Sequence, residues 1–195
     1  MSENFDLVVV GGGSGGIAAA RRAAEYGARV ALVEAGRLGG TCVNVGCVPK
    51  KVMWNAAEFV GAVADARGYG FDASLGAHDW PAMKTARDAY VARLNGIYEN
   101  NLTKSKVEIV RGWALLRDAH TVMVGERELR GERVLIASGG RPRRPQISGA
   151  DLGIDSDGFF ALSQRPQRVT VIGGGYIAVE IAGVFAALGS EVTLM

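Results

Sequence analysis

The spacing of apolar residues along the chain predicts alternating strands and helices. Near each end, a run of β-branched apolar residues stops at a cluster of glycines, which is typical of a buried strand followed by a turn. An alanine-rich stretch with helical spacing comes next, and then a glycine and a second apolar run. We therefore predict a strand, a glycine turn, a helix and a second strand at both ends, within an α/β fold.

These two units are copies of one pattern, because residues 7–33 align with residues 169–195 without a gap. The aligned small residues are Gly11 with Gly173, Gly13 with Gly175, Gly16 with Ala178, and Gly27 with Gly189. The last glycine of each copy stands where the helix should end, a position that favours glycine.

Between the two copies we expect two helices and three strands. The helices cover 48–67 and 79–101, and the strands cover 107–111, 121–124 and 133–137. A cluster of glycine and proline at 139–145 indicates a connection between domains, with the boundary between about 145 and 165. This divides the chain into a first domain at 1–150 and the start of a second at 151–195.

The first glycine cluster has the spacing of a dinucleotide-binding turn. Gly11 allows a tight turn, Gly13 lets the backbone approach a pyrophosphate, and Gly16 permits close packing of helix and strand. The N-terminus of the following helix offers N–H groups and a positive dipole end to phosphates. Glu34 ends the second strand at the distance expected of a carboxylate that binds ribose hydroxyls. The alternative is a helix–strand crossover that binds no ligand.

The second cluster opens the run Gly173-Gly174-Gly175-Tyr176-Ile177-Ala178. Its alanine at the third motif position is a variant that the dinucleotide fingerprint allows. An acidic residue at the position equivalent to Glu34 would favour NAD, whereas basic residues would favour NADP. The chain stops at Met195, one residue before that position, so this pattern alone leaves the choice open.

Composition narrows the class of protein further. The 28 glycines among 195 residues exceed the usual share of about 7% and gather in clusters, as backbone near a ligand does. The net charge of +2 gives no reason to expect nucleic acid as a partner. Glycines interrupt the apolar start of the chain, so neither a signal peptide nor a membrane span is predicted. We expect a cytoplasmic protein, in which cysteines are more often catalytic or metal-binding than structural.

The only two cysteines are Cys42, in a glycine-flanked loop, and Cys47, at the start of a predicted helix. Iron–sulfur and zinc sites need further ligands, and both histidines are remote, so no metal is expected. Two interpretations remain, a pair of small buried side chains or a redox disulfide. The second is favoured, because a helix N-terminus and Lys50 one turn later stabilise a thiolate.

Residues 39–54, GGTCVNVGCVPKKVMW, resemble the active-site segment of the flavoprotein disulfide reductases. The resemblance extends over essentially the whole chain and includes DAYVARLNGIYENNLTKS, IASGGRP, GIDSDGFFAL and GGGYIAVEIAG. The paired lysines and the Val-Met-Trp that follows them are most similar to the branch that reduces glutathione disulfide. The resemblance implies a Rossmann-like, three-layer FAD-binding domain and the beginning of a Rossmann-like NADP-binding domain.

The resemblance also implies which residues form the site. The FAD-binding set is Gly11, Gly13, Ser14, Gly15, Gly16, Glu34, Thr41, Cys42, Lys50, Ala114 and Gly139. The second glycine turn adds Gly173, Gly174, Gly175, Ile177 and Glu180 to the cofactor-binding residues. The residues that match positions touching glutathione are Ser14, Arg21 and Tyr98.

The implied reaction passes electrons from NADPH to FAD and on to a Cys42–Cys47 disulfide, which then reduces glutathione disulfide. Cys47 is the thiol against the flavin, and Cys42 is the interchange thiol that attacks the substrate. Lys50 lies beside the flavin and is paired with Glu180, while Tyr176 covers the nicotinamide side. Each of these polar side chains, like those assigned to glutathione, has an alternative as a plain surface or packing residue.

The chain departs from the family chiefly in length. The third FAD-contacting segment, the basic residues for the NADP phosphate, and the interface domain with its histidine–glutamate pair lie downstream of the matching part. We therefore expect a homodimer for the parent protein, mostly through that domain, and no turnover by this chain alone. Ser138 and Gly174 replace the usual threonine and alanine without removing a needed group. A reductase of thioredoxin or another disulfide, and a non-catalytic FAD-binding module, remain alternatives.

Overall fold

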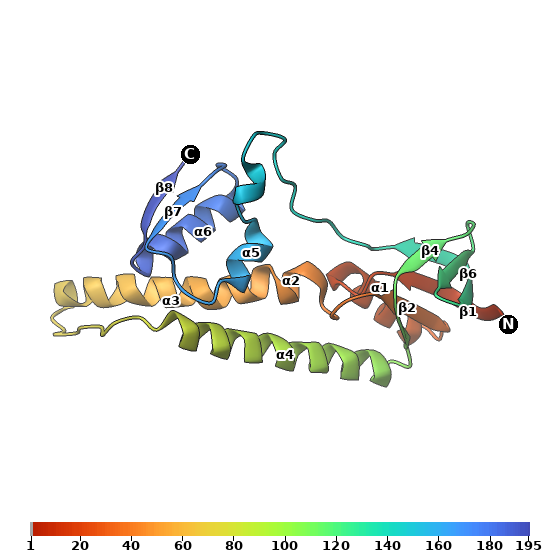
Figure 1. The fold of residues 1–195 in the computed structure, drawn as a ribbon. Helices are drawn as coiled ribbons and strands as arrows, with labels where there is room; N and C mark the ends of the chain where they lie inside the picture. The colour runs from red at the N-terminus through yellow and green to blue at the C-terminus, as the bar shows by residue number, and fades with distance from the viewer. Residues whose placement is uncertain (1) are drawn as a thin grey trace. The chain divides into compact units, whose positions relative to one another are not determined.

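The computed structural model describes residues 2–195, which form two compact units (Figure 1). The sheet unit comprises the chain up to Asn44 together with Val91–Arg141, and the helical unit comprises Val45–Tyr90 and Pro142–Met195. Helix α4, Trp80–Lys104, contributes its first residues to the helical unit and its last residues to the sheet unit. In the described part of the chain, no helix is both long and apolar enough to cross a membrane.

A six-stranded sheet in the order β3-β2-β1-β6-β5-β4 forms the centre of the sheet unit. Its strands are β1 (Ser2–Val10), β2 (Val30–Glu34), β3 (Glu108–Arg111), β4 (Ala114–Leu116), β5 (Thr121–Val124) and β6 (Arg127–Ile136). Strands β3, β2, β1 and β6 run parallel, whereas β4, β5 and β6 form an antiparallel meander. Two helices complete the unit before α4, namely α1 (Ser14–Glu25) and α2 (Gly40–Asn44).

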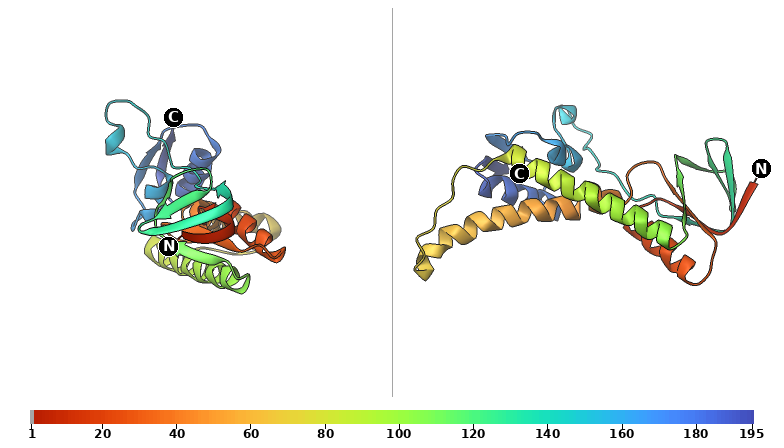
Figure 2. Two further views of the ribbon diagram at one scale, coloured as in Figure 1. Left: turned by 90° about the vertical axis from the view of Figure 1, so that its right-hand side faces the viewer. Right: turned by 90° about the horizontal axis from the view of Figure 1, so that it is seen from below.

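Two apolar cores cover the opposite faces of this sheet, because successive strand residues such as Val8 and Val9 point to opposite sides. One core packs α1 and α4 against the sheet and contains Val9, Ile17, Ala20, Val30, Leu32, Leu38, Leu102 and Val107. The other packs the meander and contains Phe5, Val8, Ala31, Val33, Val110, Val122, Val124 and Leu129. The sheet unit therefore has the predicted layers. In Figure 2 (left), strands of the sheet lie above the C-terminal half of α4, which is drawn in green.

Helices dominate the other unit. They are α3 (Cys47–Asp65), the first part of α4, α5 (Ser156–Ala161), α6 (Tyr176–Ala187) and the 3₁₀ turns η1 (Ala66–Tyr69) and η2 (Ala150–Leu152). Two parallel strands, β7 (Arg168–Val171) and β8 (Glu191–Leu194), pair beside α6. Aromatic rings fill the core: Trp80 stacks on Phe185 with ring centroids 5.7 Å apart, and Phe159 meets Phe185 edge-on at 5.0 Å.

The two predicted copies fold alike. Gly11 and Gly173 have φ angles of +113° and +116°, and each donates its N–H at 2.8 Å to an equivalent carbonyl near the end of the second strand of its copy, that of Val33 or Met195. Gly27 and Gly189, one residue past the caps of α1 and α6, have φ angles of +89° and +96°. These left-handed conformations favour glycine because it has no Cβ, which explains why glycine recurs at these positions.

Most of the elements expected from the sequence are present. The predicted helices over 48–67 and 79–101 are confirmed as α3 and α4, and the predicted strands are confirmed as β3, β5 and the end of β6. The apolar pattern did not predict α2, β4 and α5, since segments of three to six residues are too short to show a periodic pattern. The assignment of domains to 1–150 and 151–195 stays a prediction.

Candidate functional site

The first glycine turn is closed on its inner side by the sheet. A Cβ on Gly11 would overlap the Ala137 carbonyl at the end of β6, and a Cβ on Gly16 would overlap the Gly11 carbonyl. A Cβ on Gly15 would meet nothing within 4 Å. The turn is therefore packed tightly where helix α1 meets β1 and is open at the start of the helix, where Ser14 and Gly15 are exposed. An open helix N-terminus behind a glycine turn is the arrangement that holds phosphates.

Glu34 anchors the turn from the end of β2. Its half-buried carboxylate accepts hydrogen bonds from the Gly12 N–H at 2.7 Å and the Gly36 N–H at 2.6 Å. The two bonds use different carboxylate oxygens, and each oxygen has a further lone pair for a hydroxyl group. This arrangement fits the predicted role of Glu34 toward ribose, at the carboxyl edge of parallel strands where nucleotides bind.

Three other predicted FAD-contacting residues lie in the sheet unit. Thr41 is exposed on α2, Ala114 begins β4 and is half-buried, and Gly139 is exposed with a φ angle of +71°. Gly139 follows β6, and a Cβ there would meet nothing within 4 Å. Together with the glycine turn and Glu34, these residues are compatible with FAD. Their contacts to it stay a prediction.

The loop that carries Cys42 is attached directly to the glycine turn. The Gly39 N–H donates to the Gly12 carbonyl at 2.8 Å, and Gly13 and Gly39 form a parallel bridge. A Cβ on Gly40 would stand 2.7 Å from the Gly13 Cα, so the two backbones touch. Cys42 follows on α2 and is half-buried. The structure thus brings the loop that carries the predicted interchange thiol next to the predicted phosphate-binding turn, which the sequence alone did not establish.

Two asparagines that were not predicted to be functional hold this loop. The Asn44 side chain donates from Nδ2 to the carbonyls of Leu38 at 3.2 Å and Gly40 at 2.9 Å. Asn95, on α4, donates from Nδ2 to the same Leu38 carbonyl at 2.8 Å and to Asn44 Oδ1 at 3.0 Å. Both lie within segments that resemble the family, but no sequence pattern marks a pair 51 positions apart as partners.

In the helical unit, Cys47 and Lys50 share the first turn of α3. The helix begins at Cys47, whose side chain is exposed, and the Lys50 N–H donates to the Gly46 carbonyl at 3.0 Å. Lys50 Nζ donates to Glu180 Oε1 of α6 at 2.7 Å, with both side chains about a quarter to a third exposed. The predicted pairing of Lys50 with Glu180 is therefore present, while its place beside a cofactor stays a prediction.

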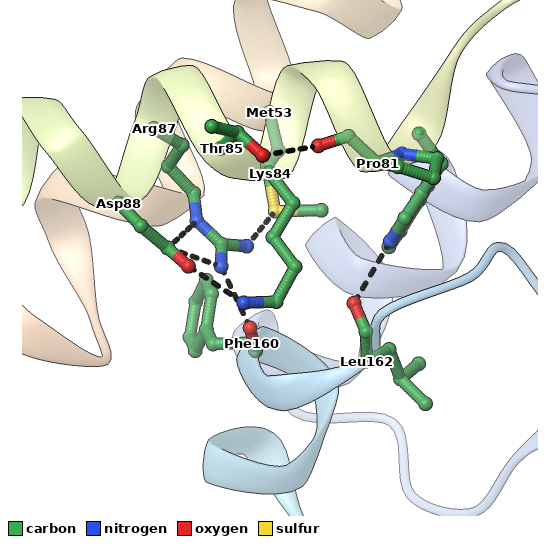
Figure 3. A network of polar contacts seen from close by, with 9 residues as sticks. Met53, Pro81, Lys84, Thr85, Arg87, Asp88, Phe160 and Leu162 are labelled. Carbon is green, nitrogen blue, oxygen red and sulfur yellow. Dashed lines mark hydrogen bonds and ion pairs between the residues drawn. The ribbon is translucent and has the colours of Figure 1, made fainter.

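The buried side chain of Arg87, on α4, contacts both α3 and α5 in the helical unit (Figure 3). The Arg87 side chain is 2% exposed and donates to the Phe160 carbonyl at 2.7 Å and to the Met53 sulfur at 3.2 Å. It also donates twice to Asp88, which Lys84 contacts from the other side at 2.6 Å. Partial burial by itself raises the pKa of Asp88, but hydrogen bonds from Lys84 and Arg87 outweigh it and lower the pKa.

The second glycine turn is more open than the first. A Cβ on Gly173, Gly174 or Gly175 would meet nothing within 4 Å. The reason is that β7 pairs with β8 alone in the described residues, whereas β1 lies between two strands. At the start of α6, Tyr176 is 76% exposed and Ile177 is 44% exposed. Their contacts with a nicotinamide cofactor stay a prediction.

The residues assigned to glutathione differ in accessibility. Ser14 is exposed, whereas Arg21 is half-buried and donates from Nε to the Ser105 hydroxyl at 3.1 Å. Tyr98 is partly buried against the core between α1, α4 and the sheet. Arg21 and Tyr98 thus have structural contacts and are not plain surface side chains. Their binding role stays a prediction.

Comparison with known proteins places this geometry in a class. The pattern of the pyridine nucleotide-disulphide oxidoreductase family matches residues 5–195, and the chain belongs to that family. It is 55% identical to a glutathione reductase of Yarrowia lipolytica and 54% identical to a glutathione reductase of Schizosaccharomyces pombe. Each alignment covers 98% of this chain, which spans 44% and 43% of the length of these relatives. The family and the Rossmann-like α/β fold predicted from the motifs are confirmed.

Proposed function

We propose that this chain is the FAD- and disulfide-bearing part of a glutathione-disulfide reductase that uses NADPH. The observation that carries the proposal is the attachment of the Cys42 loop to the first glycine turn, through the Gly39 N–H and the Gly12 carbonyl. A redox thiol next to a dinucleotide-binding turn is the arrangement that this reaction requires. The identity to two glutathione reductases supports the choice of substrate.

FAD would be held by the open turn around Ser14 and by the Glu34 carboxylate, with Thr41, Ala114 and Gly139 along the same edge of the sheet unit. When bound, it supplies two-electron transfer from a nicotinamide cofactor to a disulfide. The turn at Gly173–Gly175 would hold that nicotinamide cofactor. The same resemblance supports NADPH as the donor.

Cys42 and Cys47 would carry out the exchange with glutathione disulfide. The Cys42 thiolate attacks one sulfur of the substrate, forms a mixed disulfide and expels one glutathione thiolate, which takes a proton from solvent. The Cys47 thiolate then attacks the Cys42 sulfur, closes the Cys42–Cys47 disulfide and expels the second glutathione. The cysteine pair loses two electrons and the substrate gains two. Cys47 is the more exposed thiol, so the order of attack is the step that needs an experiment.

Trapping the mixed disulfide tests both the substrate and the order. Reduced Cys47→Ser and Cys42→Ser chains are mixed with glutathione disulfide, and bound glutathione is followed by intact mass spectrometry. We expect the Cys47→Ser chain to take up glutathione faster and to keep it. Equal rates in the two variants, or no disulfide in the unsubstituted chain, would contradict the proposal. Oxidised thioredoxin as a second oxidant tests the alternative reductase.

A second measurement addresses the cofactor directly. The purified chain is incubated with FAD and passed through a desalting column, and we expect it to emerge with a flavin absorption spectrum. From the same resemblance we propose that a parent protein of the relatives' length is a cytoplasmic homodimer. Light scattering after gel filtration would measure its mass, and a monomer would contradict that part.

A further inference from the structure

The two asparagines near the Cys42 loop form an unusually dense set of side-chain hydrogen bonds. Asn44 Nδ2 lies within 2.9–3.3 Å of three carbonyl oxygens, those of Arg37, Leu38 and Gly40. Asn95 Nδ2 donates both to the Leu38 carbonyl and to Asn44 Oδ1. The opposite orientation of either amide would direct its oxygen at carbonyl oxygens, so the contacts determine the orientation of both. We call Asn44 and Asn95 the asparagine clamp.

The loop held by the clamp cannot keep its conformation through local structure alone. It contains Gly39 and Gly40 with φ angles of +98° and +58°, left-handed values that favour glycine. Helix α2 has five residues, whereas an isolated helix needs about 12–15 residues to reach even marginal stability in water. The clamp adds a side-chain restraint to the backbone contacts that the loop makes with the first glycine turn, because Asn95 belongs to the long helix α4 and is half-buried there.

We propose that Asn44 and Asn95 are positioning residues that hold the Cys42 thiol in the conformation from which it forms a disulfide with Cys47. The proposal rests on the proposed function of this cysteine pair. Cys42 lies within the clamped segment, two residues before Asn44. A loop with fewer accessible conformations presents its thiol at a higher effective concentration to a partner five residues away. The clamped conformation is, on this proposal, the one that the disulfide requires, so the clamp favours the disulfide over the dithiol form that the structure has.

Exchange of the Asn95 amide for a carboxylate tests this with little change in shape. Asn95→Asp removes both donated hydrogen bonds and directs an oxygen at the Leu38 carbonyl and at Asn44 Oδ1. Asn95→Ala removes the same bonds without adding charge and keeps a strong helix former. Asn100→Asp is the matched control, because Asn100 is exposed on the same helix and acquires the same charge.

The measurement is the equilibrium between the thiol pair and the Cys42–Cys47 disulfide of the whole chain in glutathione redox buffers at pH 7, read by mass spectrometry. We expect the equilibrium constant for disulfide formation to fall about tenfold in Asn95→Asp and Asn95→Ala, the effect of losing one or two net hydrogen bonds. Tenfold corresponds to about 30 mV for this two-electron couple. Asn100→Asp should match the unsubstituted chain within twofold.

Thermal unfolding of the same variants separates positioning from a merely structural role. A structural role lowers the unfolding temperature of the Asn95 variants but leaves the disulfide equilibrium within twofold of the unsubstituted chain, and that outcome would overturn the proposal. If Asn95→Asp does not fold, Asn95→Ala decides. If the unsubstituted chain forms no Cys42–Cys47 disulfide, the proposed function itself has failed, and the clamp proposal falls with it. If the unsubstituted chain forms the disulfide and the Asn95 variants form it with the same equilibrium constant, the clamp proposal fails while the proposed function stands.

Discussion

Lys50 and Glu180 are joined by a 2.7 Å ion pair although 130 positions separate them along the chain. Lys50 stands in the first turn of α3, three residues after Cys47, and Glu180 stands in the second turn of α6, after the glycine turn Gly173–Gly175. The pair therefore links the start of the helix that carries Cys47 to the helix of the second glycine turn. In the proposed reductase, a substitution of Lys50 or of Glu180 should affect both the first turn of α3 and the second glycine turn.

Separating Lys50 from Glu180 should cost a small amount of stability. The two side chains are 25% and 30% exposed, so the interaction is partly screened by solvent, and we expect Lys50→Met to lower the free energy of unfolding by about 0.2–1 kcal/mol. Lys51→Met, at the exposed neighbouring lysine, is the control and should have no measurable effect. Urea unfolding of Lys50→Met, Glu180→Gln and the double variant measures the coupling. Additive effects would show that the pair contributes nothing.

The two adjacent glycines at the start of α1 should respond oppositely to alanine. A Cβ at Gly16 overlaps the Gly11 carbonyl, and backbone must move to relieve it, so Gly16→Ala should destabilise by about 1–3 kcal/mol or more. Gly15→Ala is the control in the same turn of helix. Its Cβ meets nothing within 4 Å, and alanine favours helix, so stability should be unchanged or slightly higher. Equal destabilisation by both would contradict the packing described for this turn.

Removing the Arg87 guanidinium should destabilise the helical unit. Arg87→Met takes the Arg87 hydrogen bond from the Phe160 carbonyl and leaves Lys84 as the ion-pair partner of Asp88, and a buried acceptor that loses its donor costs about 1–3 kcal/mol. Lys84→Met, which also removes a contact to Asp88, should cost much less because Lys84 is more exposed. Thermal or urea unfolding measures both. Equal losses of stability in Arg87→Met and Lys84→Met would show that the burial of Arg87 does not determine the size of the effect.

Asp88 should make stability depend on acid pH. Its pKa in the folded chain lies below the ordinary value of 3.8, so its contribution is complete above that value and is lost as the pH falls through the folded pKa. Glu3 and Asp118 also have lowered pKa values, so the wild-type profile alone does not isolate Asp88. Asp88→Asn should flatten the acid limb of the unfolding profile below pH 3.8. An acid limb that is unaltered in Asp88→Asn would show that Asp88 does not contribute to the pH dependence of stability.

Glu34→Gln should weaken binding of a dinucleotide. The carboxylate accepts two backbone N–H groups through different oxygens, whereas a glutamine directs an NH₂ group at one of them. We expect FAD affinity to fall about tenfold or more, since hydrogen bonds to charged groups contribute about 1.5–3 kcal/mol. Flavin fluorescence titration measures it. Glu25→Gln, at the exposed end of α1, is the control, and equal affinity in all three chains would exclude Glu34 from the site.

The repeated glycine pattern, the class of fold and the family were readable from the sequence. Glycine at Gly11, Gly27, Gly173 and Gly189 reports a backbone with positive φ, which is a local requirement that each residue expresses by itself. The period of the apolar residues likewise predicted α3 and α4, because a helix of many residues repeats its pattern several times. The position of Cys47 at the start of α3 followed from the same local reasoning.

Only the tertiary structure decided which distant side chains meet. Asn44 and Asn95 have no shared local pattern, and an asparagine on a helix surface has the same sequence signature whether it is solvated or holds a loop. Arginine side chains are mostly exposed, yet Arg87 is buried and donates hydrogen bonds to Phe160, Met53 and Asp88. Hydrogen bonds and ion pairs between such residues depend on how helices pack. The sequence therefore predicted most of the helices and strands and the candidate site residues. The packing of the helices determined the side-chain contacts that hold these segments in place.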